Sequence, residues 1–212
     1  RPGRDRDRAS CARFVKGETG MRMAYADPPY LGCCKLYSHY HPNGFCWDDL
    51  GTHEMLIRRL VSEYPDGWAL SASSPSLRRI ISLCPEDVRV AAWVKTFCAF
   101  KRGVRPAYAW EPVIFWRGRN PSNGHPHAPP EKGGKQTTPK DFLAEPITLK
   151  KGLTGAKPAK FCSWVLDLLN VQDGDDFVDL FPGTGSMGRA LEQRFACAAS
   201  PSRSSTKSKQ KA

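Results

Sequence analysis

The four residues Asp27 to Tyr30, with the sequence DPPY, have the residue types of a site that activates an amino nitrogen. They follow directly on a predicted strand, Met21–Ala26, and open α/β sheets bind ligands at the carboxyl ends of their strands. A nucleobase amine is a weak nucleophile because its lone pair is delocalised, so catalysis needs acceptors that draw its N–H bonds out of plane. Asp27 and the Pro28 carbonyl can accept those bonds, and Tyr30 can stack on a flipped base. Taken alone, DPPY is equally consistent with an ordinary Pro-rich turn.

A second segment, Phe177–Leu191, reads FVDLFPGTGSMGRAL, in which an apolar run ends at two glycines and a predicted helix begins. Glycines let backbone amides approach a ligand closely, and the start of a helix offers unpaired N–H groups. The segment lacks both the Gly-Lys-Ser/Thr of a phosphate loop and a complete G-x-G-x-x-G fingerprint. A tight turn without a ligand is the alternative interpretation.

Together the two segments resemble the DNA amino-methyltransferases, the adenine-N6 and cytosine-N4 family. DPPY resembles their catalytic motif, DLFPGTGSMGRA their cofactor motif, and Lys157-Pro158 with the apolar residues after it the segment that precedes that motif. The catalytic motif comes first, which is the permuted order of the beta group. The resemblance covers most of Met21 to Phe195.

This resemblance implies an α/β fold, the Rossmann-like three-layer sandwich of S-adenosylmethionine-dependent methyltransferases. Its catalytic residues would be Asp27, Pro28, Pro29 and Tyr30, and S-adenosyl-L-methionine would be its cofactor. The implied cofactor-binding residues are Asp27, Lys157, Pro158, Asp179, Phe181, Pro182, Gly183, Thr184 and Gly185. The family commonly adds an acidic residue after the next strand to hold the ribose, but only ACAAS and a polar tail follow Phe195. A truncated sheet edge is therefore expected.

The activity implied is base-flipping methylation of adenine N6 in double-stranded DNA, because DPPY is more typical of adenine-specific members. Cytosine-N4 methylation and an RNA substrate are alternatives within the enzyme class. A non-catalytic nucleic-acid-binding relative with a defective cofactor pocket is the alternative from another class. The recognition sequence, an accompanying restriction nuclease and formation of a homodimer stay open.

Apolar runs of strand length alternate with amphipathic stretches, which predicts βα units around a largely parallel sheet in one domain, residues 20–199. The segments Val88–Lys95 and Glu111–Trp116 are expected to form an antiparallel pair. The other predicted strands are Met21–Ala26, Trp68–Ser73 and Asp176–Phe181, and the predicted helices are Asp48 or Asp49 to Tyr64, Ser76–Cys84, Lys157–Asn170 and Ser186–Phe195.

The net charge of +11 is concentrated in a few segments. Residues 117–160 hold nine Lys or Arg against three Asp or Glu, as expected of loops that meet phosphates. We therefore place a variable target-recognition region at residues 117–155. The predicted nucleic-acid contacts are Arg117, Arg119, Lys132, Lys135, Lys150 and Lys151. Residues 1–19 and 200–212 are predicted to be a disordered basic arm and tail.

No apolar run approaches the roughly 20 residues needed to span a bilayer, and no signal-peptide pattern is present, so we expect a soluble, intracellular protein. With the family resemblance, the expected location is cytoplasmic and nucleoid-associated, in a bacterium or encoded by a phage. The eight cysteines form no C-x-x-C spacing and are expected to be reduced. The group Cys33, Cys34, His39, His41 and Cys46 fits no standard zinc spacing, so no metal is expected. His125 and His127 are expected to be exposed or to touch DNA.

Three tryptophans, Trp93, Trp110 and Trp116, lie on strand patterns and are expected in the core or a pocket wall rather than as wedges between bases. Glu111 interrupts an otherwise apolar strand. If buried, its carboxylate needs a partner, and its role is left open.

Overall fold

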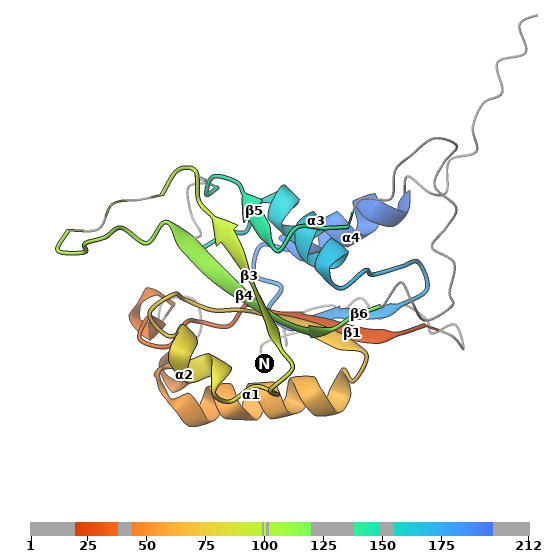
Figure 1. Ribbon diagram of the computed structural model, residues 1–212, viewed down its shortest axis with the longest axis horizontal. Helices are drawn as coiled ribbons and strands as arrows, with labels where there is room; N and C mark the ends of the chain where they lie inside the picture. The colour runs from red at the N-terminus through yellow and green to blue at the C-terminus, as the bar shows by residue number, and fades with distance from the viewer. Residues whose placement is uncertain are drawn as a thin grey trace, which may run out of the picture.

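The computed structural model describes residues 20–37, 44–98, 100, 102–119, 138–148 and 155–196, which form a mixed six-stranded sheet with helices on both faces (Figure 1). The strands are β1 (Arg22–Ala26), β2 (Gly67–Ser71), β3 (Arg89–Val94), β4 (Trp110–Arg117), β5 (Phe142–Ala144) and β6 (Asp176–Asp179). The α-helices are α1 (Leu50–Glu63), α2 (Leu77–Ile81), α3 (Ala159–Leu168) and α4 (Ser186–Ala196), and two short 3-10 helices are η1 (Cys34–Leu36) and η2 (Gly44–Asp48).

The strand order is β5-β3-β4-β2-β1-β6, and β4 alone among these strands runs against the others. The expected antiparallel pairing of β3 with β4 is confirmed. We call the edge at which β1, β2, β3 and β6 end and β4 begins the carboxyl edge, and the opposite edge the amino edge. The direction of β4 therefore places Glu111 at the carboxyl edge and Arg117 at the amino edge.

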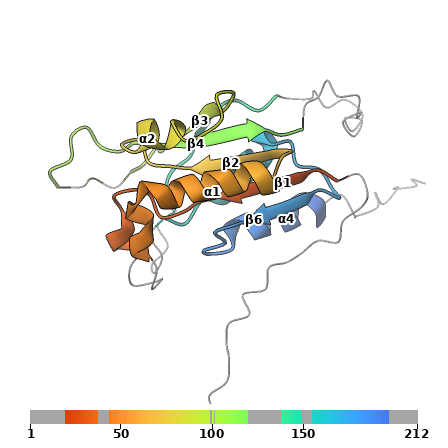
Figure 2. The same cartoon turned by 90° about the horizontal axis from the view of Figure 1, so that it is seen from below.

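Alternating side chains of the strands enter two separate cores. Met23 and Tyr25 of β1 pack on the face covered by α3 and α4, whereas Ala24 and Ala26 pack on the face covered by α1 and α2. This two-residue period is the consequence of strand geometry. The three layers are seen in Figures 1 and 2, where α1 lies across one face of the sheet and α4 lies on the other.

The helix and strand bounds differ from the sequence predictions at a few places that bear on the site. Pro158 is the extended N-cap of α3, so Lys157 lies just before the helix rather than in its first turn. The strand β6 ends at Asp179 instead of Phe181. The parallel pairing of β5 with β3 was not predicted, because three residues carry no period that separates strand from loop.

The outermost strand on one side of the described sheet is β6, which pairs only with β1. The strand that precedes the glycine turn is thus the last strand on its side within the described residues.

Several sequence predictions lie outside the described residues. These are the arm, the tail, most of the recognition region with Lys132, Lys135, Lys150 and Lys151, and His39, His41, His125 and His127. Across the described ranges, no group of three or more His, Cys, Asp or Glu side chains is arranged to hold a metal ion. In the same part of the chain, no helix combines the length and apolarity needed to cross a membrane.

Candidate active site

The two motifs predicted to carry the chemistry lie side by side at the carboxyl edge. Their strands, β1 and β6, are parallel neighbours, with Tyr25 opposite Asp179 in the register. The N–H of Leu180 donates to the carbonyl of Tyr25 at 2.9 Å, which extends the pairing to the point where both strands end. Asp27 and the glycine turn at Gly183 therefore emerge from adjacent strands although they are far apart in the sequence.

The ammonium group of Lys157 lies at the centre of this edge. Its Nζ donates to Asp27 Oδ1 at 2.9 Å and to the Tyr30 hydroxyl at 2.8 Å, and it lies 3.4 Å from Glu111 Oε2. The side chain is 8% exposed. The sequence predicted Lys157 to lie beside the cofactor; in the structure its contacts are with the DPPY motif and with β4.

The hydroxyl of Tyr30 is held between these charged groups. It lies 2.8 Å from Glu111 Oε2 and 3.2 Å from Asp27 Oδ1, and because a hydroxyl has only one hydrogen, the shorter contact with Glu111 is the one it donates. It accepts the hydrogen bond from Lys157, whose Nζ lies 5.3 Å from the centre of the tyrosine ring. The ring is thereby fixed through its hydroxyl.

Glu111 and Lys95 complete the cluster, and neither was assigned to the site from the sequence. Lys95 Nζ donates to Glu111 Oε1 at 2.6 Å, and the two side chains are 12% and 17% exposed. The antiparallel register, with Trp93 opposite Glu111, brings Lys95 to the same edge. A carboxylate inside an apolar strand was the available signal for Glu111, because a buried charge needs a partner. Nothing in the sequence indicated a role for Lys95, because a lysine at the end of a strand is usually exposed to solvent.

Burial and neighbouring charges give the two carboxylates of the cluster opposite pKa shifts. Burial raises the pKa of Asp27 and the charge of Glu111 raises it further; Lys157 opposes both but leaves a net rise. Burial also raises the pKa of Glu111, but Lys157 and Lys95 outweigh it and the net pKa is lowered. Burial lowers the pKa of Lys157, and Asp27 and Glu111 reverse this to a net rise. Glu111 and Lys157 therefore stay ionised, and Asp27 is the group readier to take up a proton.

The glycine turn after β6 has the backbone geometry that its sequence predicts. Gly183 has a φ of 44° and Gly185 a φ of 71°, a region that side chains other than glycine rarely adopt. The N–H of Gly185 donates to the Pro182 carbonyl at 2.6 Å, and Arg189 closes the turn by donating to the Thr184 carbonyl at 2.9 Å. The turn leads directly into α4, which begins at Ser186.

Asp179 lies at the end of β6 with a carboxylate that has no cationic partner among the described residues. Burial raises its pKa to about 6, with a further rise from Asp27, while the N–H of Phe181 opposes the shift by donating to Oδ1 at 3.1 Å. A half-buried acid without a counter-charge favours a cation as ligand.

A loop after the DPPY motif packs against the glycine turn. Trp47 of η2 makes an edge contact with Phe181, with ring centres 5.2 Å apart, and a second with His53 at 5.3 Å. The same loop is fixed by Asp48, which accepts from the Cys34 thiol at 2.7 Å and from the Gly32 N–H at 2.8 Å. The described part of this Cys-rich segment therefore lies beside the glycine turn.

Two of the basic residues predicted to contact nucleic acid are described, Arg117 and Arg119, and both lie at the amino edge, away from the DPPY motif. Arg117 ends β4 at the amino edge, six residues of extended strand or about 20 Å from Glu111. Arg119 forms an ion pair with Asp175 at 2.5 Å, with side chains that are 16% and 1% exposed. Arg119 is thus engaged in holding the amino edge together. Its assignment to nucleic-acid contact stays a prediction without geometric support.

Comparison with known proteins gives a likeness in structure but not in sequence. No protein-family model matches the chain, and no curated protein matches it. TTHA0409 from Thermus thermophilus, a candidate DNA modification methylase complexed with S-adenosyl-L-methionine, is 15% identical, with 82% of this chain and 76% of that chain covered at a TM-score of 0.52. Its selenomethionine derivative is 14% identical, with coverages of 81% and 75% and a TM-score of 0.51. The likeness shows that this chain has the α/β Rossmann-like fold of S-adenosylmethionine-dependent methyltransferases.

Proposed function

We propose that this chain is an S-adenosylmethionine-dependent DNA methyltransferase that methylates the N6 amino group of adenine. The observation that carries the proposal is the pairing of β1 with β6, which sets the Asp27–Tyr30 motif beside the glycine turn at Gly183. Open α/β sheets bind ligands at this edge. The fold, and a structural neighbour described as a DNA modification methylase, support the same assignment.

The charges of the site fit S-adenosylmethionine. Asp27, Glu111 and Asp179 supply three carboxylates against the two ammonium groups of Lys95 and Lys157. The cofactor carries a sulfonium, an ammonium and one carboxylate, so its net positive charge complements this excess of acid. Asp179 would hold a cationic part of it, and the turn from Pro182 to Gly185 allows close approach of the backbone.

The cofactor would supply a methyl group on a sulfonium that is already activated. The protein must make the amine a nucleophile. Asp27 and the Pro28 carbonyl would accept hydrogen bonds from its two N–H groups, which favours the tetrahedral nitrogen that attacks. When the N–C bond forms and the C–S bond breaks, the amine loses a proton, and the raised pKa of Asp27 suits it as first acceptor.

Glu111 acts as a positioning residue in this proposal. It fixes the Tyr30 hydroxyl at 2.8 Å and shares Lys157 with Asp27. A target base stacked on Tyr30 would thus meet a ring that cannot swing. The base must leave the duplex because its amino group is otherwise paired and stacked. Asp at the first position of DPPY supports adenine as the target through the resemblance described above.

The test is methyl transfer from labelled S-adenosylmethionine to unmethylated double-stranded DNA, followed by digestion to nucleosides. We expect label in N6-methyl-2′-deoxyadenosine and binding of the cofactor in calorimetry. Label in N4-methyl-2′-deoxycytidine would overturn the choice of base and leave the chemistry standing. Absence of both label and cofactor binding would overturn the enzyme assignment and favour a non-catalytic nucleic-acid-binding protein.

A further inference from the structure

The hairpin that joins β3 to β4 projects from the carboxyl edge beyond the body of the sheet (Figure 1). At its base the N–H of Lys95 donates to the Ala109 carbonyl at 2.8 Å, which continues the antiparallel pairing past the ends of the strands. On one side the N–H of Ile147 donates to the Phe97 carbonyl at 3.4 Å. The hairpin is therefore attached at its base and open to solvent farther out.

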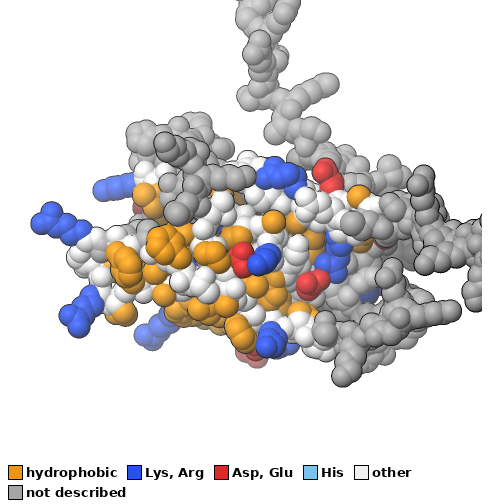
Figure 3. Space-filling view, turned by 90° about the horizontal axis from the view of Figure 1, so that it is seen from above, with side chains coloured by type: hydrophobic (Ala, Val, Ile, Leu, Met, Phe, Trp, Pro, Cys, Tyr) orange, Lys and Arg blue, Asp and Glu red, His pale blue; other side chains and the backbone are white. Residues whose placement is uncertain are grey.

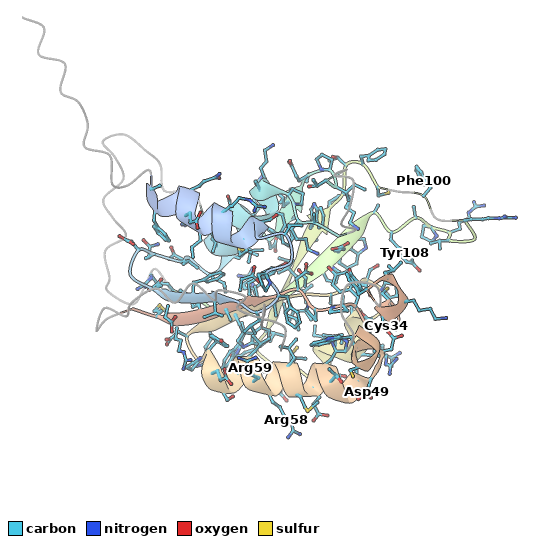
Figure 4. All side chains as sticks on the ribbon, turned by 180° about the vertical axis from the view of Figure 1, so that it is seen from behind. Cys34, Asp49, Arg58, Arg59, Phe100 and Tyr108 are labelled. Atoms are coloured by element: carbon cyan, nitrogen blue, oxygen red, sulfur yellow. The ribbon has the colours of Figure 1, made fainter. Side chains whose placement is uncertain are left out.

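Large aromatic side chains are exposed along this hairpin. Phe100 is 85% exposed, Phe97 53% and Tyr108 42%. Trp110 at the start of β4 is 37% exposed and lies outside the core, whereas Trp93 and Trp116, at 3% and 6% exposed, are core residues as expected. Exposed aromatics gathered in one place indicate a binding surface rather than chance. Figure 4 shows Phe100 and Tyr108 at the same end of the molecule as Cys34 of the active-site loop.

Positive charge is interleaved with these aromatics. The sequence from Lys95 to Trp110 contains four Lys or Arg and no Asp or Glu. Arg102 and Arg105 are exposed, and the described residues give neither of them an ion-pair partner. Figure 3 shows apolar side chains gathered toward the end of the molecule where the hairpin lies, with Lys and Arg side chains projecting from that end.

The combination of exposed aromatic rings and positive charge on the hairpin decides between two possible partners, a second copy of the chain and a nucleic acid. A second copy of the chain would bring the same arginines face to face, and like charges disfavour that contact. A nucleic acid offers phosphates to the guanidinium groups and bases to the aromatic rings, which is the chemistry of surfaces that bind single-stranded nucleic acids. The charge of the hairpin therefore favours the polyanion.

The hairpin is also continuous with the active site. Lys95 at its base is paired with Glu111, which in turn holds Tyr30. A strand that delivered a base to Tyr30 would pass this hairpin, where the neighbouring bases lose a stacking partner once the target base has left the duplex.

We propose that the hairpin surface, formed by Phe97, Phe100, Arg102, Arg105, Tyr108 and Trp110, binds the DNA strand that carries the target base. Arg102 and Arg105 contact phosphates, and Phe100 and Tyr108 stack on bases that are exposed beside the flipped base. The inference rests on the proposed function for the identity of the nucleic acid. It adds a contact surface outside residues 117–155, where the sequence alone placed recognition.

The experiment measures DNA affinity of the full chain by fluorescence anisotropy across a range of salt concentrations, with a labelled duplex and the matching single strand. One test variant is Arg102→Ala with Arg105→Ala, and its control is Arg58→Ala with Arg59→Ala, which removes equal charge from exposed positions on α1 (Figure 4). The other is Phe100→Ala, with Met55→Ala as control, because Met55 is an exposed apolar residue of α1 at 66%. Cofactor affinity and melting temperature are measured for each.

We expect the double arginine variant to lower the slope of log affinity against log salt by about 1 to 2. We expect Phe100→Ala to weaken single-strand binding by roughly 5- to 100-fold, with the control variants, cofactor affinity and melting temperature unchanged. Equal DNA binding by test and control variants would overturn the proposal, as would loss of a dimer in sedimentation with DNA affinity unchanged. If the hairpin variants lose DNA binding but the parent protein transfers no methyl group, the proposed function alone is overturned. If the parent transfers methyl groups and the hairpin variants do so equally well, this inference alone is overturned.

Discussion

Two ion pairs with little exposure lie at opposite edges of the same sheet, Arg119–Asp175 at the amino edge and Lys157–Asp27 at the carboxyl edge. Asp175 also accepts backbone hydrogen bonds, from the Met21 N–H at 2.9 Å and from the Gln172 N–H at 2.8 Å. Both of its oxygens are thus used to hold the starts of β1 and β6 together. The group is complete without a ligand.

The carboxyl edge is built differently. The contacts of Asp27 within the described residues come from side chains, Lys157 and Tyr30, and its side chain is 21% exposed against 1% for Asp175. Its counter-ion is shared with Glu111, a second acid that raises the pKa of Asp27. A carboxylate such as Asp175, whose oxygens both accept backbone hydrogen bonds, stabilises the fold. A carboxylate such as Asp27, which shares its counter-ion with another acid and is partly exposed to solvent, is available for chemistry.

The largest effect that separates the two edges should come from Asp27→Asn. This change keeps the shape of the side chain but removes the carboxylate that accepts from the amine, so we expect methyl transfer to fall by about a thousandfold or more. DNA and cofactor binding should stay within a few-fold of the parent. The control is Asp49→Asn, an exposed acid at the start of α1 (Figure 4). Activity within tenfold of the parent would remove Asp27 from the mechanism.

Asp175→Asn should act on stability instead. Breaking a buried ion pair leaves Arg119 uncompensated, so the free energy of unfolding should fall by about 3 to 5 kcal/mol. Asp176→Asn is the matched neighbour, because its pair with Arg22 is partly exposed at 51% and 31% and should be worth less than about 1 kcal/mol. Denaturant unfolding measures both variants. Similar small losses for the two variants would mean that the amino edge is not the saturated structural cluster described here.

The sequence predicted that each of the two motifs follows a strand, and the resemblance to a known family implied that they serve one reaction; the structure adds that the two strands are direct neighbours. The sequence also contained the information needed to tell which residues of β4 lie at the carboxyl edge and which at the amino edge. Once β3 and β4 are taken as antiparallel, Glu111 must lie at one end of β4 and Arg117 at the other. A count of basic residues along the chain carries no such direction, so it assigned Arg117 and Arg119 to nucleic-acid contact without indicating that they lie at the amino edge.

The contacts of Lys157 could not be predicted in the same way. Lys157 precedes α3, whereas its partners Asp27 and Glu111 come from the end of β1 and from β4, and nothing local in the sequence specifies the pairing. The same holds for Lys95, whose link to Glu111 depends on the register of β3 with β4. Pairings between distant segments are fixed by packing rather than by local propensity.

Glu111→Gln sharpens the comparison within the carboxyl edge. Glutamine can still accept from Tyr30, but the charge that raises the pKa of Asp27 is lost, so that pKa should fall. We expect methyl transfer to drop by about 10- to 100-fold, with the acidic limb of the pH–rate profile moved to lower pH. Glu145→Gln, at the pair with the exposed Lys160, is the control. A drop in rate with an unmoved pH profile would leave Glu111 a structural role only.

The smallest effect concerns Asp179, whose pKa is raised to about 6 from an ordinary value of 3.8. A carboxyl pKa raised by folding means that the ionised group costs stability at pH values above 6 and costs none below 3.8. Asp179→Asn should therefore stabilise the unliganded protein by about 1 to 2 kcal/mol at pH 8 and leave it unchanged near pH 4. Thermal melts at the two pH values measure this, with Asp176→Asn as the control.

The same carboxylate should favour the cofactor. A bound cation needs Asp179 ionised, so cofactor affinity of the parent should rise between about pH 5 and pH 7, and the variant should lose both that rise and much of the affinity. Calorimetric titration of S-adenosylmethionine at several pH values measures it. A variant that is more stable yet binds the cofactor less well would show that Asp179 lowers the stability of the unliganded protein but favours cofactor binding. Asp175 at the amino edge, by contrast, contributes to stability alone. Unchanged cofactor binding would place the cation elsewhere than at Asp179.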